Sequence, residues 1–164
     1  MQRQRIQPGP GQESVWDYPR PPRLEATPKR IRVIFNQIVI ADSTATYRVL
    51  ETSHPPVYYI PPTAIAMAYL MTTPQQSWCE WKGAAHYYTV CVGEHAALNA
   101  AWSYPTPTDD FAAIANYVAF YPSRMDACYV NDELVQAQPG DFYGGWITQE
   151  IVGPFKGDPG TWGW

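Results

Sequence analysis

Apolar residues in this chain form short runs of alternating character, and most runs end at a proline, a glycine or an asparagine. Short alternating runs rich in β-branched and aromatic side chains are typical of β-strands. We expect strands at 32–35, 38–41, 47–51, 57–60, 86–92, 97–104, 117–121, 127–130 and 133–136. The pattern predicts an all-β, mainly antiparallel fold.

Local signals predict two hairpins and one or two short helices. Asn36-Gln37 and Asn131-Asp132 each separate two expected strands, and asparagine is favoured in two-residue hairpin turns because it tolerates positive φ values. Segment 63–71 has apolar residues at helical spacing, which predicts a helix. Segment 109–115 begins with two aspartates, whose charges stabilise the start of a second, short helical turn.

The flanking regions differ from this strand-rich centre. Residues 1–31 are rich in glutamine, proline and arginine and lack periodicity, so we expect an extended arm that is flexible over 1–12. The core domain is expected at 32–136. Residues 137–164 alternate aromatic residues with glycine and proline, and we expect this C-terminal extension to pack on the core.

Charge is unevenly distributed along the chain. The net charge is −4, but residues 1–32 carry +4 and the remainder carries −8. An acidic body argues against nucleic-acid binding, which needs a basic face. The basic segment contacts either an anionic partner or the acidic body of its own chain, and we favour the second interpretation.

Cysteine usage indicates the compartment. Cys79, Cys91 and Cys128 are far apart and include no Cys-x-x-Cys pair, which disfavours a zinc site and a disulfide framework and fits a reducing cytoplasm. The N-terminus lacks the apolar stretch of a signal peptide, and no apolar run approaches the ~18 residues of a membrane span. We expect a cytoplasmic, metal-independent protein with no cofactor and no membrane partner.

Residues 78–83 concentrate two indoles, a thiol, a carboxylate and an ammonium group in one short stretch. Lys82 is one of only four basic residues beyond position 32, and it stands between a tryptophan and a glycine. It is either a solvated surface cation or the positive group of an aromatic pocket.

Several motifs in order resemble a known family. They are Glu51-Thr52 followed by Pro55 to Pro61, Trp81-Lys82-Gly83, Ala101-Trp102, Ala119 to Pro122, and Phe142 to Trp146. Over about residues 15–164 the chain resembles the bacterial domain of unknown function numbered four hundred and twenty-seven, which is sometimes filed under a nucleotidyltransferase heading. That heading is a label with no reaction behind it. The chain contains neither Gly-x-x-x-x-Gly-Lys-Ser/Thr nor Gly-x-Gly-x-x-Gly.

The resemblance implies a β-tent-like fold in which two antiparallel sheets lean together over a pocket, with one or two short helices and extended terminal arms. Relatives of this fold, such as methionine sulfoxide reductase and cereblon-type domains, are pinned by zinc through paired cysteines. Those pairs are absent here, so zinc is not carried over.

The leading polar pair is Lys82 with Glu51. Lys82 would bind an anionic or carbonyl group beside Trp81, and Glu51 would orient it or exchange a proton with it. Tyr121 is the third candidate for proton chemistry. A structural salt bridge or an exposed lysine is the alternative. Cys79, three residues before Lys82, is either a nucleophile or an inert buried thiol.

Aromatic residues supply the expected walls of the pocket, although such rings also dominate the cores of small β domains. Strand alternation allows only one of Tyr58 and Tyr59 to face a given cleft. Between His54 and His86, we expect His86 to line the cleft. The predicted ligand-binding residues are Trp81, Lys82, Glu51, Tyr58, His86, Trp102, Tyr121 and Trp146.

Three functions remain open from the sequence. The first is binding of a small organic molecule in an aromatic cleft anchored by Lys82. The second is an enzyme that acts on that molecule through Lys82 and Glu51. The third is an interaction module that uses its terminal arms, with self-association into a homo-oligomer as one form.

Overall fold

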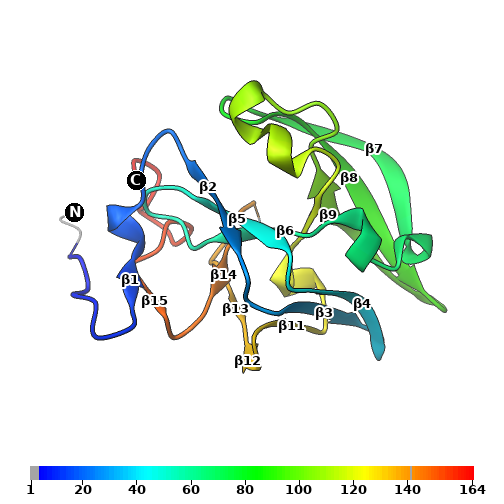
Figure 1. Ribbon diagram of the computed structural model, residues 1–164, viewed down its shortest axis with the longest axis horizontal. Helices are drawn as coiled ribbons and strands as arrows, with labels where there is room; N and C mark the ends of the chain where they lie inside the picture. Colours follow the sequence, from blue (N-terminus) through cyan, green and yellow to red (C-terminus); the bar gives the residue numbers. More distant parts are fainter. Residues whose placement is uncertain (1–3, 141) are drawn as a thin grey trace.

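Short strands joined by tight turns build this protein, because prolines and glycines interrupt every apolar run (Figure 1). The computed structural model describes residues 4–140 and 142–164. Arg3 and the start of the arm expected to be flexible lie outside the described residues. The first half contains β1 (Glu13–Ser14), β2 (Arg23–Thr27), β3 (Ile31–Phe35), β4 (Ile38–Ser43), β5 (Thr46–Leu50), β6 (Val57–Tyr59) and β7 (Leu70–Cys79). The second half contains β8 (Gly83–Val92), β9 (His95–Ser103), β10 (Val118–Phe120), β11 (Ala127–Val130), β12 (Glu133–Leu134), β13 (Gln136–Ala137), β14 (Trp146–Ile147) and β15 (Ile151–Val152).

Two four-stranded antiparallel sheets form the body. One has the order β10-β9-β8-β7, and the other has the order β12-β11-β3-β4; Figure 1 shows them as separate layers. A three-stranded sheet, β2-β5-β6, joins the first through Ile60 and Val118, whose backbones exchange two hydrogen bonds of 2.9 Å. The structure confirms an all-β, mainly antiparallel domain built on two principal sheets.

Both predicted hairpins are confirmed. Asn36 and Gln37 adopt φ values of 47° and 67° between β3 and β4, and Asn131 adopts a φ of 54° between β11 and β12. The left-handed conformation at these positions gives the turn the twist of its flanking strands.

The helix predicted at 63–71 is wrong. The segment forms two single 3₁₀ turns, η2 (Pro62–Ala64) and η3 (Met67–Tyr69), and then enters β7. Ile65 between the turns is extended and pairs with Ala41 of β4, so tertiary pairing overrides the helical spacing. The described residues also contain the 3₁₀ helices η1 (Val15–Asp17), η4 (Asp109–Ile114) and η5 (Pro122–Arg124).

Strand alternation divides the apolar residues between two clusters on opposite faces of β6 and of the first sheet. Tyr58 and Phe120 belong to the main core between the two sheets. Their neighbours Tyr59 and Tyr121 belong to an aromatic cluster on the other face, together with Trp102. This second cluster forms the floor of the candidate site.

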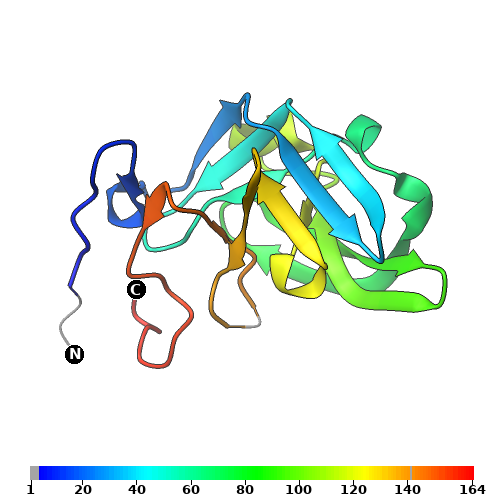
Figure 2. The same ribbon diagram turned by 90° about the horizontal axis from the view of Figure 1, so that it is seen from below.

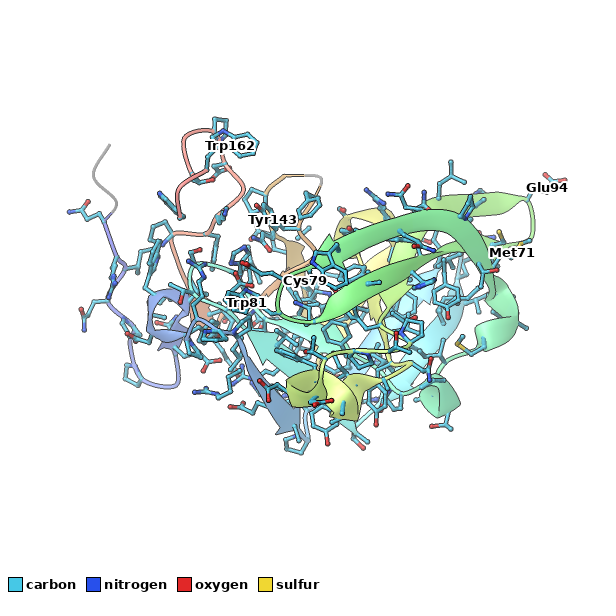
Figure 3. The ribbon with its side chains drawn as sticks, turned by 90° about the horizontal axis from the view of Figure 1, so that it is seen from above. Met71, Cys79, Trp81, Glu94, Tyr143 and Trp162 are labelled. Atoms are coloured by element: carbon cyan, nitrogen blue, oxygen red, sulfur yellow. The ribbon has the colours of Figure 1, made fainter. Side chains whose placement is uncertain are left out.

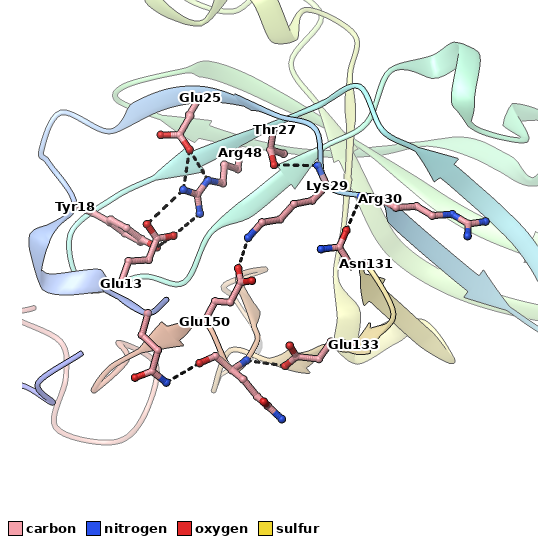
Figure 4. A network of polar contacts seen from close by, with 12 residues as sticks. Glu13, Tyr18, Glu25, Thr27, Lys29, Arg30, Arg48, Asn131, Glu133 and Glu150 are labelled. Atoms are coloured by element: carbon pink, nitrogen blue, oxygen red, sulfur yellow. Dashed lines mark hydrogen bonds and ion pairs between the residues drawn. The ribbon is translucent and has the colours of Figure 1, made fainter. Parts of the chain in front are cut away.

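The two ends of the chain lie side by side (Figure 2). β1 pairs in parallel with β15, and Trp16 is buried, with its indole donating to the carbonyl of Pro154 at 2.9 Å. The guanidinium group of Arg48 binds the carboxylates of Glu13 and Glu25 (Figure 4). The N-terminal arm is thus fastened to the body and to the C-terminal extension.

The basic arm pairs with acidic residues of its own chain, as favoured from the charge distribution. Its ion pairs are Arg20 with Glu51, Lys29 with Glu150, Arg30 with Asp42, and Arg32 with Asp132. Among residues 4–140 and 142–164, no helix has the length and apolar character needed to cross a bilayer.

Candidate functional site

A cleft of about 290 Å³ opens above the aromatic cluster. Its walls come from the ends of β5 and β6, the β7–β8 hairpin, the end of β9, and the C-terminal loops. Figure 3 shows Cys79 and Trp81 at the tip of that hairpin, which points toward the loop that carries Tyr143. The volume lies near the lower end of the range for small-molecule sites.

Lys82 lies inside this cleft and is only 8% exposed. Its Nζ lies 3.3 Å from Sγ of Cys79, 5.6 Å from the ring centre of Tyr104 and 5.8 Å from that of Phe111. In the part of the chain that the structure describes, no carboxylate forms an ion pair with it. A buried cation with such weak partners is expensive to maintain.

The backbone fixes the position of Lys82. Gly83, the first residue of β8, has a φ of 104°, which a residue with a side chain rarely adopts. Thr108, just before η4, donates its backbone N–H to the carbonyl of Lys82 and its hydroxyl to the carbonyl of Trp81, at 3.1 and 2.6 Å. The ammonium group is therefore held in the cleft by its own turn and by η4.

Lys82 remains charged at neutral pH. Burial disfavours the ammonium form, but the charges that Tyr59, Cys79 and Glu51 carry when ionised favour it, and the balance raises the pKa of Lys82. Burial also raises the pKa of Tyr59, so this phenol is neutral under the same conditions. The cleft therefore presents a cation against neutral aromatic groups.

Aromatic side chains make the floor rigid. The indole of Trp102 donates to the hydroxyl of Tyr59 at 3.3 Å, and its ring lies 4.6 Å from that of Tyr121. The hydroxyl of Tyr121 donates to the carbonyl of Phe142 at 3.2 Å. A Cβ atom on Gly144 would lie 2.3 Å from the Trp102 ring, so only glycine allows the C-terminal loop to close this side of the cleft.

Glu51 and His54 form a polar cluster at another edge of the cleft. Glu51 pairs with Arg20 at 3.4 Å, and its carboxylate lies 3.8 Å from Nδ1 of His54. His54 Nδ1–H donates to the carbonyl of Thr52 at 2.9 Å, which leaves Nε2 as the acceptor. Burial, helped by Lys156 and Arg20, lowers the pKa of His54, so the ring is neutral at pH 7.

A family comparison now bears on this geometry. The model of a family described as a domain of unknown function (DUF427), labelled NTP_transf_9, matches residues 23–131, about two thirds of the chain. The chain belongs to the DUF427 family. The search of curated proteins gives no match. The resemblance seen in the sequence is confirmed over these residues. The family description assigns no reaction.

Five of the eight predicted ligand-binding residues line the cleft of this DUF427 protein: Trp81, Lys82, Glu51, Trp102 and Tyr121. Lys82 and Glu51 share the cleft but form no hydrogen bond or ion pair with each other: Glu51 pairs with Arg20, and Lys82 contacts Cys79. Tyr121 is held by its hydrogen bond to the loop.

The other three predicted residues do not line this cleft. Tyr58 is 2% exposed and packs on Trp146, which is fully buried in the main core and donates its indole N–H to the carbonyl of Phe120. His86 lies on the exposed face of β8. Strand alternation explains the positions of Tyr58 and His86, because their neighbours Tyr59 and Tyr87 are the residues that face the cleft.

Three residues that line the cleft of the DUF427 protein are absent from the set predicted from the sequence. His54, and not His86, is the histidine that lines the cleft, and it directly precedes the prolines of the Glu51 motif. Gln138 and Lys156 come from the C-terminal extension, outside the family match, and no local pattern marks them. Among the described residues, no group of three potential metal ligands clusters here or elsewhere.

Proposed function

We propose that this DUF427 protein binds a small organic molecule in the cleft, with the ammonium group of Lys82 holding an anionic or carbonyl oxygen of that molecule. The observation that carries the proposal is the burial of Lys82: a cation that is 8% exposed has a thiol and two ring faces as partners, and no carboxylate among the described residues. A ligand oxygen would supply the missing charge-assisted hydrogen bond.

The walls of the cleft favour a planar or apolar ligand body. Trp81, Trp102 and Tyr121 line it, and aromatic faces bind flat or apolar groups well. Ser77 and Gln138 also line the cleft, with the hydroxyl of Ser77 bonded to that of Tyr87 and the amide of Gln138 bonded to the backbones of Gly145 and Lys156, so these two side chains shape the wall.

A reaction on the bound molecule is the second candidate function. The contact of 3.3 Å between Sγ of Cys79 and Nζ of Lys82 favours it, because a neighbouring ammonium stabilises negative charge that develops on a reacting sulfur or on a ligand oxygen. The neutral Nε2 of His54 offers a proton acceptor in the same cleft.

A thermal-shift screen of a metabolite collection tests the binding proposal. We expect selected compounds to raise the melting temperature of the wild type and not of Lys82→Met. Lys29→Met removes a lysine that pairs with Glu150 outside the cleft, and it should respond like the wild type. The proposal fails if no compound shifts the wild type selectively, or if all three proteins respond equally.

Mass spectrometry of the recovered compound separates the two candidates. Binding alone returns it unchanged. A reaction gives a product whose formation is lost in Lys82→Met and reduced in Cys79→Ser.

A further inference from the structure

The cleft that contains Lys82 has a second hollow beside it. This hollow, of about 610 Å³, lies between the loop that precedes β14 and the loop that follows β15. The two share Phe142, Tyr143 and Lys156 as lining residues, so they lie next to each other at these three side chains. We call the second hollow the outer groove.

The outer groove displays aromatic surface to solvent. Phe142 is 70% exposed and Trp162 is 88% exposed, and Figure 3 shows Trp162 on the C-terminal loop. Large apolar side chains gathered at one hollow are typical of a binding surface. Among the described residues that line it, the charged ones are Lys156, whose ammonium lies 5.7 Å from the ring centre of Tyr143, and Asp158. These described residues contribute one cation and one anion, so their charges balance.

The outer groove belongs to this chain's extension and not to the matched part of the family. It is lined from Gly140 to Trp162, whereas the family match ends at residue 131. The residues around Lys82 lie within the match. Lys82 and the residues that line the outer groove therefore come from different parts of the chain.

We propose that the outer groove is a second subsite, which binds the apolar tail of the same ligand whose oxygen contacts Lys82. The ligand class is then an elongated organic acid or carbonyl compound: an oxygen at one end, a flat middle against Trp102, and an aliphatic or aromatic tail over Phe142 and Trp162. This inference rests on the proposed function. The cleft of about 290 Å³ would hold the oxygen-bearing end and the ring of such a ligand. The tail would pass over the residues that both hollows share and enter the outer groove.

A series of 4-alkylbenzoates tests this arrangement, because every member has the same carboxylate and ring. Benzoate and its 4-ethyl, 4-butyl and 4-hexyl derivatives are titrated into ¹⁵N-labelled protein, and Kd is measured from the tryptophan indole signals. Each methylene that leaves water contributes up to about fourfold in Kd. We expect 4-butylbenzoate to bind the wild type at least tenfold more tightly than benzoate, and to shift the indole signal of Trp162, which benzoate leaves unchanged.

Three variants locate the effect. Trp162→Ala should bind benzoate like the wild type but lose most of the gain from the tail. Phe142→Ala removes a side chain that lines both hollows, so it should weaken benzoate binding and also lose most of the gain from the tail. Both side chains are exposed, so their removal should not unfold the protein. Leu98→Ala removes an apolar side chain that is 72% exposed and far from the groove lining, and it should keep the full gain.

The outcomes distinguish the two proposals. If benzoate binding depends on Lys82 but the tail adds nothing, or adds as much in Trp162→Ala and Phe142→Ala as in the wild type, the outer subsite is refuted and the proposed function stands. If the tail improves binding equally in Lys82→Met, the groove binds apolar groups without the anchor, and the bipartite site is refuted. If benzoate binding is absent or unaffected by Lys82→Met, the proposed function itself fails for this class of ligand.

Discussion

Replacing Lys82 by methionine should make the protein more stable while it destroys the binding site. Methionine has a similar length and no charge, so it fills the same space without the cost of a buried ammonium group. If Lys82 were retained for structural reasons, the same change would destabilise the fold. The sign of the stability change therefore separates a functional lysine from a structural one.

The magnitude follows from the contacts. Taking one ammonium group out of water costs several kcal/mol after relaxation. The two ring contacts, at 5.6 and 5.8 Å, are near the outer limit for cation–π attraction and return about 0.5–1 kcal/mol each. The hydrogen bond to the sulfur of Cys79 returns about 1 kcal/mol. The phenolate of Tyr59 is the first of the charges that raise the pKa of Lys82, but Tyr59 is neutral at pH 7 and adds no opposite charge there. The carboxylate of Glu51 also favours the ammonium form, but it is paired with Arg20 and forms no ion pair with Lys82. We expect Lys82→Met to raise the free energy of unfolding by about 1–2 kcal/mol.

Urea unfolding at pH 7 measures this change, and a stabilisation of that size raises the melting temperature by about 2–4 °C per kcal/mol for a chain of this length. Lys156→Met is the matched control: this lysine lies at the open end of the cleft and should stay within about 0.5 kcal/mol of the wild type. A loss of more than about 1 kcal/mol in Lys82→Met would refute the reasoning, since it would show that the buried cation has stabilising partners in the folded protein.

Three further predictions concern other parts of the site and its support. Saturating 4-butylbenzoate should slow alkylation of Cys79 by iodoacetamide, whereas Cys91, outside the cleft, should react at an unchanged rate in peptide mapping; equal protection of both thiols would contradict this. Gly144→Val should cost about 1–3 kcal/mol in urea unfolding and weaken benzoate binding, since its side chain enters the Trp102 ring; wild-type binding would contradict the described wall. Burial opposes ionisation of Glu13, but the charge and hydrogen bonds of Arg48 outweigh burial and lower the pKa of Glu13 below the ordinary 4.5. The stability that this carboxylate contributes is therefore present above pH 4.5 and is lost as the pH falls through the lowered pKa. Arg48→Met should flatten the fall in the free energy of unfolding between about pH 5 and 3 and cost about 2 kcal/mol at pH 7; an unchanged pH profile would contradict the assignment.

Local signals were enough for the parts of the fold that depend on neighbouring residues. Both asparagine hairpins form because an asparagine with a positive φ value begins each turn, and this local preference does not depend on distant residues. By contrast, β7 was not predicted, because its sequence is polar and contains Pro74. The strand tolerates this proline because it is at the sheet edge and its register shifts between Thr72 and Gln76.

The candidate site was predictable where a motif fixed the residue and unpredictable where tertiary structure chose the face. Lys82 and Trp102 were found from their motifs. The choice between Tyr58 and Tyr59 needed the direction of β6 relative to the cleft, which one sequence does not contain. Lys156 lies at the cleft through contacts between distant parts of the sequence: its N–H donates to the carbonyl of Ser53, and β15, just before it, pairs with β1.

That pairing has a consequence for how the protein is made. Glu13 lies beside Ile151, so β1 leaves the ribosome long before its partner exists. Until then Trp16 has no carbonyl of Pro154 to bind, and the C-terminal side of the cleft is missing. Contacts between residues so far apart in sequence form late and slowly. A nascent chain halted before residue 138 would contain the whole matched segment 23–131 and yet lack the C-terminal wall of the cleft, which forms only after residues 138–156 have been made.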